Sequence, residues 1–251
     1  MLNKVMIGRY YPIRSLVHQM NPLAKIICTL LFVIMSFLTF DIRFNILISF
    51  LLILMVLNTK VPLKIYLRTI LSIKWLLLFI IIINVIVGSS LQITIITLLR
   101  LIYIVIYTSI LTLTTPPTEI TYGLEKFFLP LKIIGIPVNR MALSISLALR
   151  FIPTIIDQGN KILKSQASRG IDYNNSNVQG KILAIRSLII PMFMLSFKRA
   201  DDLADAMEVR LYNIDGKRVN FRQNKWGFYD TFLVLIHLAI FILIIVKGVL
   251  V

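Results

Sequence analysis

Two arginines, Arg169 and Arg210, are the side chains whose positions most suggest a specific chemical role. Each ends a long, apolar-rich helical pattern, the first over residues 137–170 and the second over residues 180–213. Arginine stays charged and presents its donors in a planar fork, so it can pair with carboxylates or with C-terminal helix carbonyls in another protein. These positions are suited to locking onto a protein partner, although an arginine near a helix end is also an ordinary C-terminal signal.

Three acids that follow closely on one another, Asp201, Asp202 and Asp205, raise a different chemistry. The order DDLAD matches the DDxxD spacing with which membrane prenyltransferases hold magnesium and diphosphate, since carboxylates at i and i+4 share a helix face. The remaining acids are scattered singly, and Lys198 and Arg199 are close enough to neutralise the cluster. The pattern favours a solvated, ion-paired face without a metal site, and a magnesium-dependent prenyltransferase is the alternative.

Other patterns of catalytic residues do not stand out in the sequence. There is no GxxxxGK[ST] pattern, so we expect the chain not to bind ATP itself. No serine, cysteine or histidine constellation suggests nucleophilic catalysis, and the single cysteine, Cys28, is expected to act as a small core hydrophobe. We therefore expect a chain that is not an enzyme, has no catalytic residue and binds no cofactor.

The composition indicates an integral membrane protein. Of the 251 residues 58% are hydrophobic and 15% are charged, whereas soluble domains are about 45–50% apolar. The net charge of +16 is carried by cations between apolar runs, which favours cytoplasmic loops that follow the positive-inside rule over a nucleic-acid-binding domain. No cleavable signal peptide is expected, because residues 1–20 are polar and contain Pro12 where an apolar region should be.

Five apolar runs predict an all-α membrane protein with about five transmembrane helices. The expected spans are residues 26–40, 44–57, 70–87, 91–114 and 226–251. The first two are shorter than the roughly 20 residues that cross a hydrocarbon core, so they are either two short spans, which we favour, or a re-entrant pair. A cytoplasmic segment with a surface helix starting at Pro62 is marked by four cations, Lys60, Lys64, Arg68 and Lys74.

Two polar residues fall inside predicted spans. Insertion of Arg100 at the centre of a span costs at least about 2.5 to 3.5 kcal/mol of free energy unless the side chain faces protein or water. Arg100 is therefore expected either to contact a partner or to be buried against carbonyls or Asn84. His237 has no second histidine or carboxylate spaced to join it in binding a metal. We expect it to be a packed or interfacial histidine.

The distribution of charge predicts three parts. Residues 1–115 form an N-terminal membrane part with four spans and a cytoplasmic N-terminus, and residues 226–251 form a C-terminal transmembrane helix that runs from inside to outside. Between them, residues 116–225 contain most of the charged side chains and are expected to be a cytoplasmic coupling region. This region should contain one short helix, residues 118–128, and two long crossed helices.

Each long helix is expected to act as a lever with an arginine at its tip. Pro153 and Pro191 each remove an intrahelical hydrogen bond and permit a bend, and roughly 24 to 29 Å of helix follows each proline before the terminal arginine. The helices are expected to cross at small residues spaced four apart, Ser144 and Ala148 in the first and Ala200 and Ala204 in the second.

Residues 114–170, from TTPPTEITYG to KSQASRG, closely resemble the transmembrane T component of energy-coupling factor (ECF) transporters, the vitamin- and metal-importing branch of the ABC transporters. The stretches GRYYPIRSLVHQMNPLAKI and AMEVRLY are similar as well. The hallmark of this family is a pair of motifs, each a small residue, an arginine and usually a glycine, at the ends of two coupling helices. The first motif is matched by Ser168, Arg169 and Gly170, whereas the second, Val209, Arg210 and Leu211, keeps only its arginine.

This resemblance implies a scaffold in the bacterial cell membrane between two P-loop ATPases, identical or different, and a separate membrane subunit that captures substrate. Arg169 and Arg210 would pair with acids of the ATPases, which themselves bind ATP and magnesium. An apolar face would slide against the substrate subunit, or would be ordinary core, and consists of Met192, Phe193, Met194 and Phe197. Because only the first motif keeps its glycine, we expect Arg169→Ala to weaken ATPase docking or coupling more than Arg210→Ala.

Overall fold

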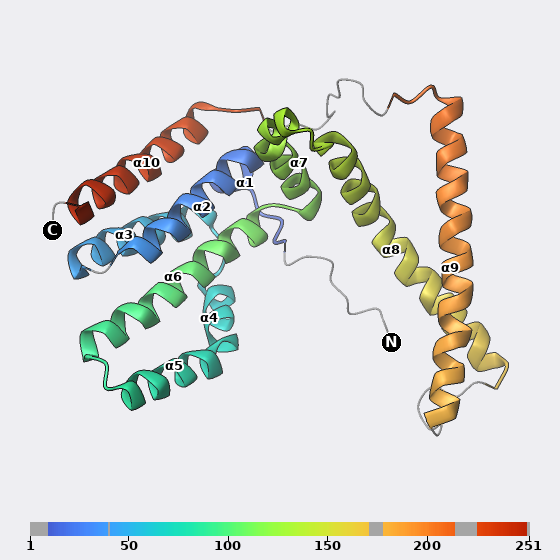
Figure 1. Ribbon diagram of the computed structural model, residues 1–251, viewed down its shortest axis with the longest axis horizontal. Coiled ribbons are helices and arrows are strands. Elements are labelled where there is room, and N and C mark those ends of the chain that lie inside the picture. Colours follow the sequence, from blue (N-terminus) through green and yellow to red (C-terminus); the bar gives the residue numbers. More distant parts are fainter. Residues whose placement is uncertain (1–9, 40, 171–177, 214–224, 250–251) are drawn as a thin grey trace. The chain divides into compact units, whose positions relative to one another are not determined.

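The computed structural model describes residues 10–39, 41–170, 178–213 and 225–249, and every regular element within them is a helix (Figure 1). In chain order these elements are α1 (Leu16–Gln19), α2 (Pro22–Leu38), α3 (Ile42–Thr59), α4 (Leu63–Ser72), α5 (Lys74–Val87), α6 (Leu91–Thr114), α7 (Pro117–Phe128), the 3-10 helix η1 (Leu129–Ile134), α8 (Val138–Ser168), α9 (Val178–Val209) and α10 (Phe228–Val249). The predicted all-α class is confirmed.

Several of these helices can cross a membrane. Among the described residues, α3, α6, α8 and α10 are long and apolar enough, and the bent pair α4 and α5 adds a fifth candidate span, while α2 is a shorter apolar helix. The predicted span 91–114 coincides with α6, and the predicted final span contains α10. The length and composition of α8 also suit a span, although the sequence places this helix in the coupling region. The protein is therefore a multi-pass membrane protein.

The predicted third span differs from the structure because the helix breaks at Ile73. The α4 and α5 axes meet there at 51°. Just before the break, the hydroxyls of Thr69 and Ser72 donate to the carbonyls of Ile65 and Arg68, at 3.0 and 2.9 Å. Such bonds from a side chain to the carbonyl four residues earlier compete with the helix ladder and bend helices. With 14 residues, α5 is only about 21 Å long, so the end of α4 must complete a span.

The described chain falls into two compact units. One, here called the membrane unit, contains residues 10–130 and 225–249, and the other, the lever unit, contains residues 131–213. In the membrane unit α2 packs along α10, α6 and α7, and α6 also packs against α3 and α4. The short predicted helix of the coupling region corresponds to α7, which belongs to the membrane unit.

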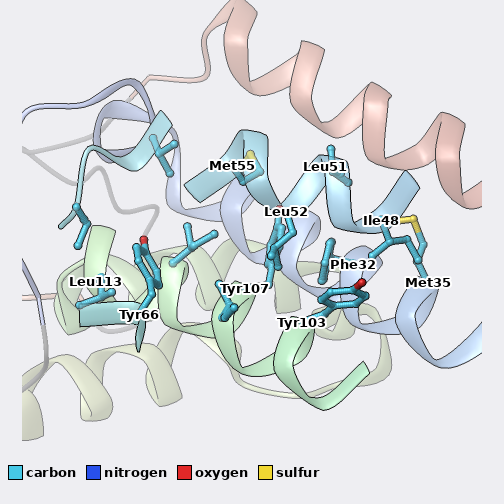
Figure 2. Packing of buried hydrophobic residues seen from close by; sticks show 14 of the residues in the cluster. Phe32, Met35, Ile48, Leu51, Leu52, Met55, Tyr66, Tyr103, Tyr107 and Leu113 are labelled. Atoms are coloured by element: carbon cyan, nitrogen blue, oxygen red, sulfur yellow. The ribbon is translucent and has the colours of Figure 1, made fainter. Parts of the chain in front are cut away.

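The core of the membrane unit lies where α2, α3 and α6 meet (Figure 2). The rings of Phe32 on α2 and Tyr107 on α6 stack at 4.0 Å between centroids. Around this pair lie buried apolar side chains from all three helices, including Met35, Ile48, Leu51, Leu52, Met55 and Tyr103. The single cysteine, Cys28, is also buried, as expected of a small core hydrophobe.

The two polar residues within predicted spans both make hydrogen bonds inside the protein, where His237 is buried and Arg100 is partly buried. His237 is fully buried, its Nδ1 lies 2.7 Å from the carbonyl oxygen of Leu233, and its Nε2 lies 2.7 Å from the hydroxyl of Tyr107. Since a carbonyl only accepts, Nδ1 carries the proton and Tyr107 donates to Nε2. Arg100 donates to the carbonyl of Thr39 at 3.0 Å. The structure thus supports the packed histidine and the arginine bound to a carbonyl.

A buried polar junction ties the beginnings of α2 and α10 to the end of α6. The ammonium of Lys25 donates to three oxygens, His18 O, Thr114 O and Thr115 Oγ1, at 3.3, 3.2 and 3.0 Å. Asp230 on α10 accepts from the backbone N–H groups of Asn21 and Gly227, at 3.0 and 2.7 Å. These bonds satisfy an otherwise costly buried cation and carboxylate and fix three helix ends together.

Candidate functional site: two arginine-ended helices

The lever unit is built on two helices that cross in opposite directions, α8 and α9 (Figure 1). Gln166, near the end of α8, donates to the carbonyl of Ser187 in the first half of α9, at 3.5 Å. Gln158, earlier on α8, accepts from the guanidinium of Arg199, later on α9, at 2.6 Å once its amide is oriented to suit this donor. The later residue of α8 thus contacts the earlier residue of α9, and the earlier residue of α8 contacts the later residue of α9. The two helices are therefore antiparallel.

The crossing does not use the small residues expected from the sequence. All four of these, Ser144, Ala148, Ala200 and Ala204, are exposed. Instead, Gly159 is buried on α8 beside Gln158, and Ala184 is buried on α9 three residues before Ser187. Small side chains still permit the close approach. The spacing of small residues along one helix did not indicate which of them would face the other helix. The hydrogen bond between Gln158 and Arg199 could not be predicted either, because no sequence pattern marks this polar pair.

Both internal prolines lie within continuous helix. Pro153 is inside α8 and Pro191 is inside α9. At 31 and 32 residues, the two helices are each roughly 46 to 48 Å long at about 1.5 Å per residue. The sequence predicted these helices over residues 137–170 and 180–213, and the observed bounds agree to within a few residues.

The first helix ends in the manner expected for a glycine cap. Arg169 occupies the C-cap position of α8, and its N–H bonds to the carbonyl of Gln166 at 3.0 Å. Gly170 follows with φ +85°, and its N–H bonds to the carbonyl of Ala167 at 3.0 Å. A left-handed residue directly after the last helical turn closes the helix and turns the chain away. The arginine is thus exposed at the tip of α8.

The second helix ends in the same backbone geometry without a glycine. Leu211 has φ +53°, its N–H bonds to the carbonyl of Glu208 at 2.8 Å, and the N–H of Tyr212 bonds to the carbonyl of Met207 at 3.0 Å. These two bonds are the pair that defines a Schellman C-terminus. Arg210 therefore has the C-cap position that Arg169 has on α8, although Leu211 replaces glycine at the left-handed position.

The two arginines lie at opposite ends of α9. Gln166, within one turn of Arg169, contacts Ser187, and from there α9 continues for roughly 33 Å to Val209, at about 1.5 Å per residue. Arg169 and Arg210 therefore do not form one site. The structure presents two separate tips, each with an exposed arginine, and they can reach two binding surfaces at once.

The two tips differ in what surrounds the arginine. The first is flanked by Ser168 and Gly170, which are small. The second is flanked by Val209 and Leu211, which are 84% and 90% exposed. Exposed apolar side chains at a charged tip are suited to a groove with an apolar wall beside its acids.

An apolar strip also runs along the outer side of α9. Phe193, Met194 and Phe197 are each more than half exposed, whereas Met192 is partly buried. The rings of Phe193 and Phe197 lie 6.2 Å apart. Further exposed isoleucines extend the strip toward the beginning of the helix, at Ile182, Ile185, Ile189 and Ile190. Three of the four residues predicted to face a substrate subunit are therefore available for contact.

The acidic cluster is on the exposed surface of the same helix. Asp201, Asp202 and Asp205 are all exposed. Among the described residues, no three histidines, cysteines or carboxylates are arranged to hold a metal ion. A DDxxD site also needs a second acidic motif on a facing helix. The described parts of the chain do not supply one, so the prenyltransferase alternative gains no support from the geometry.

Helical spans, two crossed helices and two exposed arginine tips define the chain as a multi-pass membrane protein with a pair of arginine-ended helices. The sequence matches the CbiQ family, described as cobalt transport protein, over residues 14–220. The chain belongs to this family, which includes the transmembrane components of energy-coupling factor transporters.

Curated relatives cover almost the whole chain. The energy-coupling factor transporter transmembrane protein EcfT of Listeria innocua is 38% identical, with 96% of each chain covered. The protein of the same name from Bacillus subtilis is 36% identical over 92% of this chain and 93% of its own. The one from Lactococcus lactis is 34% identical over 97% of this chain and 98% of its own.

Proposed function

We propose that this chain is the membrane scaffold of an ECF-type importer, with its N-terminus and lever unit on the cytoplasmic side of a bacterial cell membrane. Its role is to couple ATP hydrolysis by two P-loop ATPases to movement of a substrate-binding membrane subunit that takes up a vitamin or another micronutrient. The chain itself is not catalytic and binds no cofactor, and ATP and magnesium are bound by the ATPases. Family membership supports the transporter class.

The observation that carries the docking role is the repeated helix end. Arg169 and Arg210 both occupy the C-cap of a long helix, both are exposed, and the residue after each has the same left-handed backbone. Two arginines placed identically on two helices, and separated by most of the length of α9, fit two similar partners better than one. Each guanidinium would pair with carboxylates in a groove of one ATPase.

The strip on α9 is proposed to contact the substrate-binding subunit. Phe193, Met194 and Phe197 expose large apolar surfaces. The flexible side chain of methionine can repack against different partners. A strip of this kind would allow one scaffold to serve several substrate subunits.

Affinity purification of the chain from its own cells in mild detergent tests the proposal. Two ATPases and a small hydrophobic membrane protein should copurify. Arg169→Ala and Arg210→Ala should each reduce the amount of ATPase recovered, because each removes the charged fork from one tip. Arg150→Ala is the matched control, since Arg150 is an exposed arginine in the middle of α8. A chain that retains no ATPase in several mild detergents, or equal losses in all three variants, would overturn the docking role.

The relative size of the two effects is also open to this experiment. The sequence led us to expect a larger effect at Arg169, because only its motif keeps the glycine. Leu211 has a left-handed backbone with φ +53°, as Gly170 has with φ +85°, which supports similar endings for the two helices. We therefore propose comparable losses for the two variants.

A further inference from the structure

Four cations gather where α3 ends and the bent pair α4 and α5 begins. Lys60, Lys64, Arg68 and Lys74, here called the basic corner, are all exposed. The sequence contains no acidic residue between Asp41 and Glu119, so this stretch of chain supplies no carboxylate to neutralise them. The corner is therefore a local concentration of positive charge on the membrane unit.

The basic corner is built on an amphipathic helix with three distinct strips. Tyr66 and Ile70 face the protein, with Tyr66 buried and Ile70 partly buried. At about 100° per residue, the next strip around α4 contains three leucines and the strip after it contains Lys64 and Arg68. The leucines, Leu63, Leu67 and Leu71, are 60%, 57% and 62% exposed. An exposed apolar strip between the protein and a basic strip is the arrangement of a helix that lies in a membrane interface.

The turn before α4 is fixed by a buried hydroxyl network. Thr59 is fully buried, and its hydroxyl donates to the carbonyl of Val56 at 2.6 Å. The same oxygen accepts from the hydroxyl of Tyr66 at 3.0 Å and from the N–H of Val61 at 3.3 Å. Between these residues Lys60 has φ +56°, a left-handed conformation that is uncommon for lysine. The network therefore holds Lys60 in a defined position at the corner.

The residues after α4 indicate its depth in the membrane. Trp75, at the second position of α5, is 72% exposed, and the ammonium of Lys74 lies 5.4 Å from its ring centroid. Tryptophan concentrates at the boundary between hydrocarbon and headgroups. The apolar helix α5 continues from here and α4 departs from it at 51°, so with Trp75 at this boundary α4 would run obliquely through it. Its leucines then meet acyl chains, and the cations at its beginning meet headgroups.

We propose that the basic corner binds the phosphate headgroup of an anionic phospholipid, with Leu63, Leu67 and Leu71 against the acyl chains of the same lipid layer. The leucine strip and the exposed tryptophan favour a lipid over an acidic protein, because both are continuous with a membrane-spanning helix. Lysine and arginine attract anionic lipids through the surface potential and through direct contact with phosphate. This inference is independent of the proposed transport role and needs only the membrane location.

Quenching of Trp75 fluorescence tests the proposal on the full-length chain. The sequence has two tryptophans, so a Trp226→Phe background leaves Trp75 as the sole reporter. The chain is reconstituted in phosphatidylcholine vesicles that contain a small fraction of either phosphatidylglycerol or phosphatidylcholine with brominated acyl chains. We expect the apparent affinity near Trp75 to be at least about fivefold higher for the phosphatidylglycerol, the factor that one lysine or arginine near an anionic surface contributes.

Two variants with equal charge loss identify the source of the preference. Lys60→Asn, Lys64→Gln and Arg68→Gln together should lower the ratio by at least about fivefold, because only Lys74 of the corner then keeps its charge. Asparagine is chosen at position 60 because it tolerates the left-handed backbone. The matched control neutralises three other exposed cations of the membrane unit, Arg14, Arg43 and Lys126, and should keep the ratio. Equal quenching by both lipids in the unmodified chain, or an equal loss of preference in both variants, would refute a headgroup site at this corner. If the triple corner variant keeps the lipid ratio but loses a copurifying protein, the occupant is a protein and the proposal is wrong.

Discussion

Arg210 reaches its position because Leu211 accepts a backbone conformation that usually belongs to glycine. Left-handed conformations cost an ordinary L-residue about 1 to 2 kcal/mol, because Cβ approaches a backbone oxygen. Leu211 is 90% exposed, so contacts within the described chain offset little of this cost. Gly170 carries no such cost at φ +85°, and a Cβ added there would meet open space within the described structure.

Substitutions at Leu211 and Gly170 should therefore change the stability of the two helix ends in opposite directions. We expect Leu211→Gly to stabilise the last turn of α9 by about 1 kcal/mol and Gly170→Ala to destabilise the last turn of α8 by a similar amount. Hydrogen exchange of the amides in these turns measures both, and about 1 kcal/mol corresponds to roughly fivefold in protection. Faster exchange in the Leu211→Gly variant would show that the leucine makes stabilising contacts.

His18 is a second residue whose local environment predicts a measurable property. It lies in α1, outside the spans, with Nε2 2.9 Å from the carbonyl oxygen of Tyr11 and Nδ1 2.6 Å from the hydroxyl of Ser15. Since the carbonyl only accepts, Nε2 carries the proton and Nδ1 accepts from Ser15 in the neutral ring. Burial lowers the pKa of His18 below 6.5, the bond to Tyr11 opposes this, and the positive charge of Lys25 adds to the lowering.

A lowered histidine pKa makes the folded protein less stable as the solution becomes acidic. The unfolded chain binds a proton at about pH 6.5, whereas folded His18 resists protonation until a lower pH, so stability decreases as pH falls below 6.5. We expect the thermal stability in detergent to decrease from pH 7.5 to 5.5. The decrease should be smaller in His18→Gln, which cannot titrate. Identical pH dependence in the two proteins would mean that His18 does not contribute to it.

Among the helices, α7 and α2 show how one small residue sets a packing distance. A Cβ built on Gly123 of α7 would lie 2.7 Å from Cδ1 of Ile26, 3.0 Å from the backbone carbon of Pro22 and 3.1 Å from its Cβ. The isoleucine can rotate, but the backbone of α2 cannot move without disturbing the junction around Lys25. Glycine at this position therefore permits the contact between the two helices.

Substitution of Gly123 should separate α7 from α2. We expect Gly123→Ala to destabilise the chain by about 1 to 3 kcal/mol, the usual cost of overpacking. The matched control is Gly227→Ala, because a Cβ there meets Asp230 Oδ2 at an ordinary 3.7 Å. Thermal unfolding of the two variants in the same detergent gives the comparison. Equal melting temperatures for both would show that α2 and α7 can repack.

The helices themselves could be read from the sequence, but their contacts could not. Apolar periodicity and capping signals located α6 and both long helices, because these signals act within one segment of chain. The position where α8 crosses α9 depends on which small residues face each other. Ser144, Gly159 and Ala184 are all small, so the sequence alone does not show which of them lie at the crossing. The left-handed backbone of Leu211 could not be predicted either, because this position after a helix is usually occupied by glycine or asparagine and not by leucine.

At the scale of the whole molecule, the topology is defined by the side of the membrane on which each helix end lies. The length and composition of α8 suit a span. Its apolar residues, however, are concentrated before Ile156, and Asp157, Lys161 and Lys164 follow. A span that placed Lys164 and Arg169 outside would oppose the positive-inside rule and would separate the Arg169 tip from the proposed ATPases.

Labelling of single cysteines decides between these topologies. In a Cys28→Ala background, Ser89→Cys reports the turn between α5 and α6, Lys64→Cys reports α4, and Lys164→Cys reports the end of α8. We expect a membrane-impermeant maleimide to label Ser89→Cys in intact cells and to label the other two only after permeabilisation. The reason is that the turn contains no cation, whereas the other two positions are surrounded by lysines and arginines. Labelling of Lys164→Cys in intact cells would establish α8 as a span and would remove Arg169 from the cytoplasmic side, so the docking role of that tip would have to be abandoned.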